Sequence, residues 1–322
     1  MNLFRNGKPP EPIPPTSAAS PALSPRPLTR PTNAVACPGA HYEAGTYDRP
    51  DMLIDQPLAN AILLHLARHL VPSLRALRPA RAFFAIGPGG NGKSEHALAV
   101  PSRYGVDALM IAGADLCPGP LHGQSIAVLN NCIDYITYAS LLSGRPFVFI
   151  IDDIDGSILP EKPGVEQTDD TANTLGKLQA LCNGPDAFTT GNGTSVPMIY
   201  TGNNSLFLRT TLIRPGRCTF YHHTPDWQAK ARAVEHVFKP ATNHDRKRLR
   251  KLVWHYRHQP ISFFTDLRTE LADAQIISAI QAHGLDVRAL ENVASRDRSL
   301  NFNALDTAAA RRDQHRGGDL NE

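Results

Sequence analysis

Paired cysteines, long apolar runs and a large excess of charge are all lacking in this sequence, and each lack excludes a class of protein. The five cysteines lie far apart without a C-x-x-C pair, so neither a zinc site nor a disulfide framework is expected. No apolar run reaches the roughly 18 to 20 residues of a membrane span, and residues 1–5 lead into prolines. A net charge of +3 is too small to indicate nucleic-acid binding by itself. We therefore expect a cytoplasmic protein with free, buried thiols.

The sequence does contain enough apolar residues for one or two folded domains. With 42% hydrophobic and 20% charged residues, a chain of 322 residues can bury a full core. Residues 1–50 are rich in Pro, Ser, Thr and Ala, and they predict a disordered arm that is either a passive linker or a docking peptide. Residues 293–322 alternate Arg and Asp with small residues and predict a disordered tail. The folded part is expected to divide into 51–225 and 226–292.

Short apolar runs in the first of these regions predict strands. They lack alternation, which is typical of strands buried on both faces of a parallel sheet. A helix over 54–77, interrupted at Pro72, precedes them, and the apolar spacing becomes helical after Pro225. The predicted strands are 82–86, 108–111, 147–151, 196–200 and 218–221, and the later helices are 227–238, 245–256, 261–271 and 274–282. We predict an α/β domain with a parallel sheet flanked by helices, followed by a small helical domain.

A glycine-rich segment follows the first predicted strand and precedes a helix. It fits G-x-x-x-x-G-K-[ST], in which glycines let backbone N–H groups approach phosphate oxygens and the helix N-terminus adds partial positive charge. Lys93 is expected to bridge the β- and γ-phosphates of ATP, and Ser94 to ligate Mg²⁺. The alternative is a glycine-rich turn that matches by chance. The predicted nucleotide-binding residues are Gly87, Pro88, Gly89, Gly90, Asn91, Gly92, Lys93 and Ser94.

Polar side chains follow two later strands, where carboxyl ends of parallel strands open into a ligand crevice. The run 147–151 leads into Asp152, Asp153 and Asp155. We assign Asp152 to the Mg²⁺ shell and Asp153 to polarising the attacking water, whereas Asp155 is equally suited to capping the next turn. Asn203 follows the run 196–200 and is assigned to a sensor that hydrogen-bonds the water near the γ-phosphate. A turn that merely ends the strand explains Asn203 equally well.

Several segments resemble the AAA+ domain of Rubisco activase in that family's order and spacing, from about residue 53 to residue 285. They are 94–96, 112–116, 149–155, 201–203, 212–217 and 261–268. The resemblance implies an AAA+ P-loop NTPase with a helical lid, ATP and Mg²⁺ as ligands, and a ring of identical subunits, expected to be a hexamer. It also implies that Arg214 and Arg217 reach the γ-phosphate held by the next subunit. Arg268 matches the lid arginine that contacts the nucleotide of its own chain. Without the resemblance, a solvated loop and a helix-face salt bridge explain these arginines.

The sequence also departs from that family. Asp152 stands where the activases carry Asn, so the sequence leaves open whether Asp152 or Asp153 holds the metal. The segment 117–124, in the place of the first pore loop, lacks the aromatic residue by which unfolding motors grip a chain, and the activases lack it too. The Pro-rich arm does not resemble the folded N-terminal domain by which plant activases engage Rubisco. The resemblance therefore does not name the client.

The sequence supports more than one function. The first is an ATP-driven motor that remodels a protein client, either Rubisco or another protein. The second is a nucleic-acid-linked AAA+ ATPase, for which the basic segment 246–257 is the best support, although its Leu249, Leu252, Val253 and Tyr256 form an apolar stripe typical of a lid helix with a solvated outer face. The third is a small-molecule kinase, which the paired arginines and the helical lid disfavour. We expect a protein client, no membrane and no nucleic acid among its partners.

Overall fold

A computed structural model describes residues 39–47, 49, 52–117, 123–156, 169–183, 187–190, 193–203, 214–284 and 301–318. Residues 1–38 of the predicted arm and most of the segment at the first pore loop lie outside these ranges. None of the helices in the described ranges is long and apolar enough to cross a membrane.

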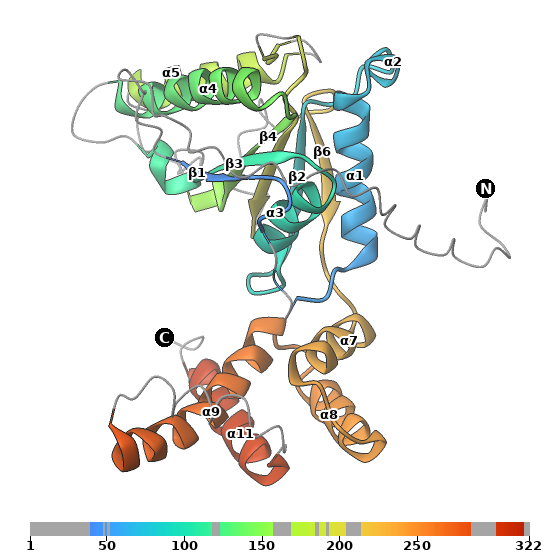
Figure 1. Cartoon of the computed structure of the whole chain (residues 1–322), viewed down its shortest axis with the longest axis vertical. Coiled ribbons are helices and arrows are strands. Elements are labelled where there is room, and N and C mark those ends of the chain that lie inside the picture. Colours follow the sequence, from blue (N-terminus) through green and yellow to red (C-terminus); the bar gives the residue numbers. More distant parts are fainter. Residues whose placement is uncertain are drawn as a thin grey trace, which may run out of the picture. The chain divides into compact units, whose positions relative to one another are not determined.

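A six-stranded sheet forms the centre of the α/β part, in the order β1-β3-β4-β5-β2-β6 (Figure 1). Neighbouring strands are parallel, except that β1 runs antiparallel to β3. Every residue of β2 and β5 is buried, as expected for unalternating apolar strands covered on both faces. The strands are β1 (Ala40–Tyr42), β2 (Ala82–Ile86), β3 (Asp107–Ala112), β4 (Phe147–Asp152), β5 (Met198–Gly202) and β6 (Cys218–His222).

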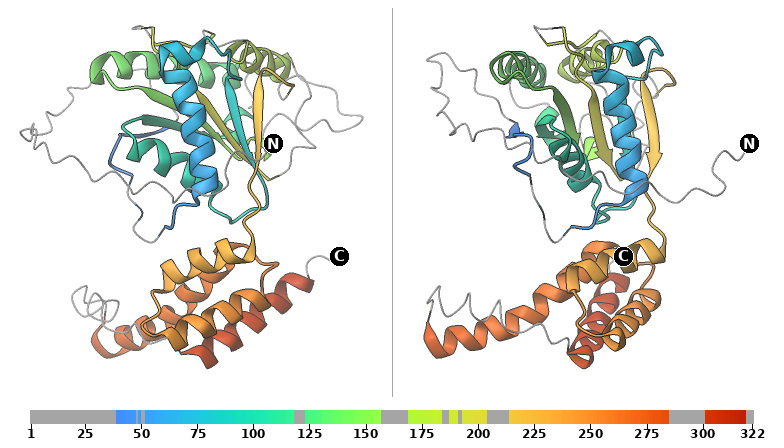
Figure 2. Two further views of the ribbon diagram at one scale, coloured as in Figure 1. Left: turned by 90° about the vertical axis from the view of Figure 1, so that its right-hand side faces the viewer. Right: turned by 45° about the vertical axis from the view of Figure 1, so that its right-hand side comes forward.

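Helices cover the two faces of this sheet (Figure 2). Phe83 and Ala85 of β2 pack with α1 and α3 in one apolar core, while Phe84 between them packs with α4 and α5 in another. This alternation follows from the period of two along a strand. The helices are α1 (Gln56–Leu70), the short α2 (Pro72–Arg75), α3 (Lys93–Arg103), α4 (Gln124–Ser143) and α5 (Asp169–Leu181), with 3₁₀ turns at η1 (Gly113–Leu116) and η2 (Ile154–Gly156).

A helical lid follows the sheet and has its own apolar core. It consists of α7 (Trp227–Phe238), α8 (Asn243–His255), α9 (Ile261–His283) and α11 (Phe302–Gly318). Val234, Leu249 and Leu267, from successive helices, are fully buried in this core. The Asp226 carboxylate caps α7, and Thr242 with Asp245 forms a capping box on α8. The predicted class, an α/β domain with a parallel sheet and a helical lid, is confirmed.

The prediction of a disordered tail over 293–322 is wrong for α11. Phe302, Leu305 and Ala309 lie at helical spacing and are buried in the lid core. Asp306 within this stripe and the Arg and Asp residues that follow it masked the stripe in the sequence. The Arg312 guanidinium pairs with Asp266 and Glu270 of α9. The segments predicted as two helices, 261–271 and 274–282, are one helix, α9.

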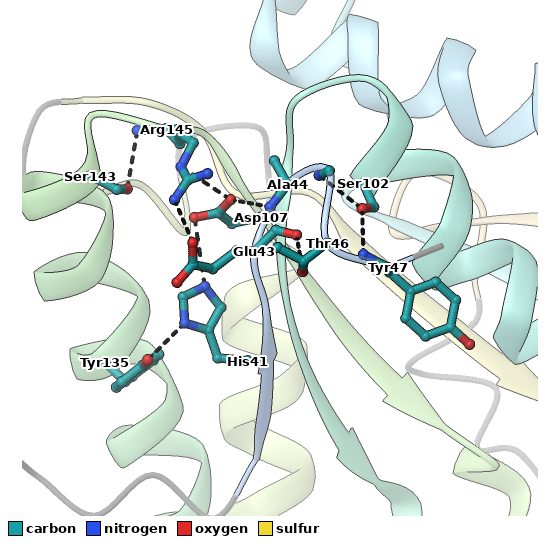
Figure 3. A network of polar contacts seen from close by, with 11 residues as sticks. His41, Glu43, Ala44, Thr46, Tyr47, Ser102, Asp107, Tyr135, Ser143 and Arg145 are labelled. Atoms are coloured by element: carbon teal, nitrogen blue, oxygen red, sulfur yellow. Dashed lines mark hydrogen bonds and ion pairs between the residues drawn. The ribbon is translucent and has the colours of Figure 1, made fainter. Parts of the chain in front are cut away.

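The prediction of a disordered arm up to residue 50 is wrong for β1. This three-residue strand pairs with β3, and a buried carboxylate, that of Asp107, anchors it (Figure 3). Asp107 accepts a hydrogen bond from the Ala44 N–H at 2.7 Å and lies 3.3 Å from Nε of Arg145. The Nε2 atom of His41 lies 3.6 Å from the same carboxylate. A three-residue strand has little local pattern of its own, so partners from far along the chain, Asp107 among them, hold β1 in place.

Candidate nucleotide site

The glycine-rich loop leaves the carboxyl end of β2 and enters α3, which begins at Lys93. Gly87 has φ +154°, and a Cβ there would lie 2.3 Å from the backbone oxygen of His223. Gly90 has φ +73°, and a Cβ there would lie 2.2 Å from the Ser262 hydroxyl. Both positions therefore require glycine. The first N–H groups of α3 have no acceptor within the helix, so they are available to an anionic ligand.

The Lys93 ammonium lies at the carboxyl edge of the sheet. It donates to the backbone oxygens of Gly87 at 2.8 Å and Pro88 at 3.0 Å, and to Oδ1 of Asn203 at 3.1 Å. Burial lowers the pKa of Lys93 below its usual value, while the carboxylates that follow β4 oppose this shift. The geometry thus brings together the predicted phosphate-binding lysine and the predicted sensor, from the loops after β2 and β5.

Asp152 lies opposite Ser94 at the same edge. One oxygen of its carboxylate accepts the Ser94 hydroxyl at 2.5 Å and also the hydroxyl of Thr201. These are hard oxygen donors of the kind that Mg²⁺ prefers, and the ion commonly takes only one or two protein ligands beside phosphates and water. The residues therefore fit a magnesium ion. The described residues contain no group of three or more His, Cys, Asp or Glu that could hold a metal ion.

Asp153 is oriented by the backbone. It has φ +49°, and its N–H donates to Oγ1 of Thr201 at 3.0 Å. Burial and the neighbouring carboxylates of Asp152 and Asp155 raise the pKa of Asp153, and the Lys93 ammonium opposes the rise. Sequence reasoning did not assign Thr201 a role. The only sequence feature of Thr201 is a hydroxyl near the end of a strand. It could be connected with Asp152 only once β4 and β5 are known to be neighbours.

Asp155 does not simply cap the turn that follows it. Its Oδ2 accepts the Asn203 N–H at 2.8 Å, and a Cβ on Gly202 would lie 2.9 Å from its other oxygen. Asp155 therefore holds the turn after β5 from the end of β4. This carboxylate positions the residue whose side chain meets Lys93.

A cavity of about 220 Å³ lies beside the loop, lined among others by Asp55, His96, His223 and Arg232. Nε2 of His96 accepts the Asp55 N–H at 2.8 Å, so the ring proton is on Nδ1 and is donated to the backbone oxygen of Gly92 at 2.6 Å. Burial lowers the pKa of His96. Sequence reasoning missed these cavity residues because they come from separate elements and share no motif.

The predicted arginines lie elsewhere. Arg217 directly precedes β6 and accepts the Ala82 N–H on its backbone oxygen at 3.0 Å, which places it at the amino end of β2, opposite the loop. Its Nε donates to Oδ1 of Asn183 at 3.1 Å. Arg214 is exposed in the same segment. Arg268 is exposed on α9. Arg217 thus lies at the opposite end of β2 from the phosphate loop.

The strand order, the phosphate loop and the lid define an AAA+ P-loop NTPase fold. Residues 83–225 match the ATPase family associated with various cellular activities (AAA). Over 240 residues the chain is 27% identical to the ribulose bisphosphate carboxylase/oxygenase activase of Anabaena sp. (strain CA / ATCC 33047), covering 71% of this chain and 57% of that protein. Over 232 residues it is 27% identical to the activase of the same name from Nostoc sp. (strain PCC 7120 / SAG 25.82 / UTEX 2576), covering 70% and 55%. The chain spans little more than half the length of these relatives. The predicted resemblance to Rubisco activase is confirmed.

Proposed function

We propose that this protein hydrolyses Mg-ATP at the edge of the sheet where Lys93, Ser94, Asp152 and Asn203 meet. The observation that carries the proposal is the convergence of these side chains from the loops after β2, β4 and β5. Lys93 binds the β- and γ-phosphates, while Ser94 and Asp152 hold Mg²⁺. When bound, the ion neutralises charge on the phosphates.

The water that attacks the γ-phosphate is handled by the residues that follow β4 and β5. Asp153 polarises it, and Asn203 orients it while Asp155 fixes the Asn203 backbone. The raised pKa of Asp153 suits a carboxylate that must accept a proton.

Phosphate release tests the proposed hydrolysis. Purified protein is expected to release phosphate from ATP when Mg²⁺ is present and to stop when the ion is chelated. This function would be contradicted if no phosphate were released, or if phosphate release continued unchanged after Mg²⁺ was chelated.

The arginines support assembly into a ring, with a hexamer as the expected size. β2 separates Arg217 from the phosphate loop by its five residues, or about 16 Å at the usual rise of a strand. An arginine at that end has no nucleotide of its own chain within reach. We infer that Arg214 and Arg217 act on the γ-phosphate of a neighbouring subunit, and that Arg268 contacts the nucleotide of its own chain.

The remodelled substrate is a protein client. The relatives are named for activating ribulose bisphosphate carboxylase/oxygenase. A direct test measures carboxylase activity of that enzyme with this protein, with and without ATP. An ATP-dependent rise that the Asp153→Asn variant does not produce would identify the client, whereas no rise would exclude that enzyme as the client.

Nucleic-acid binding finds no support in the basic helix α8. Leu249, Leu252 and Val253 of this helix are buried in the lid core. Arg250 pairs with Glu235, and the Arg248 guanidinium lies 4.4 Å from the centre of the Phe302 ring. Arg248 and Arg250 thus make contacts within the lid, whereas Lys247 and Lys251 of α8 are exposed.

A further inference from the structure

The N-terminus of lid helix α9 is capped by the phosphate loop instead of by its own preceding residue. Pro260, at the N-cap position, provides no side-chain cap. Oδ1 of Asn91 accepts the Ile261 N–H at 3.2 Å, and the Gly90 backbone oxygen accepts the Ser262 N–H at 2.9 Å. The first N–H groups of α9, which no helix can satisfy internally, are therefore satisfied from a distant loop.

Asn91 also contacts the segment that leads from the sheet to the lid. Its backbone oxygen accepts the Nε2–H of His223 at 3.0 Å, and its side-chain amide donates to the Pro88 oxygen at 3.3 Å. Asn91 therefore forms hydrogen bonds within the loop, with the segment that follows β6 and with the first turn of α9. Only 3% of Asn91 is exposed, so solvent does not compete strongly for these bonds.

The geometry of a trans peptide makes these contacts sensitive to a ligand in the loop. In such a peptide the N–H and C=O groups point in opposite directions. Because the Gly90 carbonyl points toward Ser262, the N–H of Asn91 in the same peptide points away from the lid. Likewise, the Asn91 carbonyl points toward His223, so the Gly92 N–H in the same peptide points away from His223. Phosphates that bind these N–H groups hold the Gly90 carbonyl toward the Ser262 N–H and the Asn91 carbonyl toward His223.

We propose that Asn91, together with the Gly90 carbonyl, is a positioning element that couples phosphate binding in the loop to the lid through the N-terminus of α9. The proposal rests on the nucleotide site proposed above and adds to it a route by which occupancy reaches the lid. Phosphate binding stabilises the cap, and the cap stabilises the first turn of the helix that carries Arg268.

Hydrogen exchange of amides in the first turn of α9 tests the coupling, with and without saturating Mg-ADP. In the wild type, Mg-ADP is expected to slow this exchange about fivefold, the usual scale of a helix cap. Asn91→Ala removes the side-chain acceptor and is expected to reduce the effect to less than about twofold, and to speed exchange of the Ile261 amide even without nucleotide.

A variant in the lid tests the hydrogen bond between Ile261 and Asn91 without changing the phosphate loop. Ile261→Pro deletes the N–H group that donates to Asn91. Position 261 is the first residue of α9, where proline is favoured. Pro260 has φ −71° and ψ 168°, which suit a residue that precedes proline. Ile261→Pro is expected to weaken the Mg-ADP effect as Asn91→Ala does. Ile261→Ala, which shortens the side chain but keeps the N–H, is expected to retain the effect.

Thr242→Ala is the matched control, because it removes a cap of similar strength from α8 without contacting the loop. It is expected to leave the Mg-ADP effect on α9 intact. Full retention of the effect in Asn91→Ala, or a wild type in which Mg-ADP protects 87–94 but not α9, would overturn the coupling alone. A wild type in which Mg-ADP protects neither segment would overturn the nucleotide site and the coupling with it.

Discussion

Lys93 and Asn203 stand 110 residues apart in the chain, yet the ammonium of one donates to the side-chain oxygen of the other at 3.1 Å. The contact exists because β5 lies beside β2 in the sheet and runs parallel to it, so the loops after both strands emerge at one edge. Ser94 and Asp152 meet at that edge because β4, on the other side of β5, is parallel to it as well.

Lys93→Ala is expected to weaken Mg-ATP binding by at least about tenfold, or roughly 1.4 kcal/mol, because it removes the positive charge that meets the phosphates. Titration with a fluorescent ATP analogue measures the loss. Lys251→Ala, an exposed lysine of α8, serves as the control for a change of net charge and should bind as the wild type does. Unchanged affinity in Lys93→Ala would remove the lysine from the site.

Asp153→Asn is expected to lower turnover while leaving ATP affinity nearly intact, since the change acts on the attacking water. Asp152→Asn is expected to weaken Mg²⁺-dependent ATP binding, because it removes the negative charge that lies beside the Ser94 hydroxyl at the metal position. Steady-state kinetics and Mg²⁺ titration distinguish the two. If both variants lose binding equally, the roles have been divided wrongly.

Arg217→Ala subunits, mixed with wild type, are expected to lower activity by more than their share of the mixture. Each one would disable a neighbour's intact phosphate site, and an arginine supplied in trans contributes about 10³ to 10⁵ in turnover. Specific activity should also rise with protein concentration as the ring assembles. Activity that falls in simple proportion, and that is flat with concentration, would indicate a monomeric ATPase. Asn183→Ala, which removes the Arg217 partner within the chain, controls for local packing.

Acid is expected to destabilise the α/β part through two buried histidines on α1. Burial lowers the pKa of His69 from 6.5 to about 4, and burial together with His69 lowers the pKa of His65. Nε2 of His65 donates to the backbone oxygen of Met198 and Nε2 of His69 to that of Ala80, and both rings are neutral in the fold. Since unfolding lets them take up protons, their contribution is complete above about pH 6.5 and falls as the pH drops toward 4, by up to about 3 kcal/mol for His69.

Urea unfolding midpoints between about pH 8 and pH 5 measure this effect. His69→Gln, whose amide can still donate to Ala80, is expected to show a flatter pH dependence than the wild type. A wild-type midpoint that does not fall between about pH 7 and pH 5 would contradict the assignment.

The amino-acid sequence by itself determined those features that depend on neighbours along the chain. The run 82–86, the glycines after it and the Lys93-Ser94 pair form one continuous strand-loop-helix, so the phosphate loop and its fold class could be predicted. The lid helix 227–238 could be predicted for the same reason, since its apolar spacing repeats locally. Such patterns act within a few residues and need no knowledge of strand order.

The tertiary structure alone decided which distant residues meet. That Asp155 holds Asn203, and that Thr201 donates to Asp152, depends on β4 lying beside β5, an order that no local pattern encodes. The strand β1 and helix α11 also lack strong patterns of their own, and they form because Asp107 and the lid core supply partners from far along the chain. The cap that Asn91 places on α9 belongs to the same class, because its donor and acceptor are 170 residues apart.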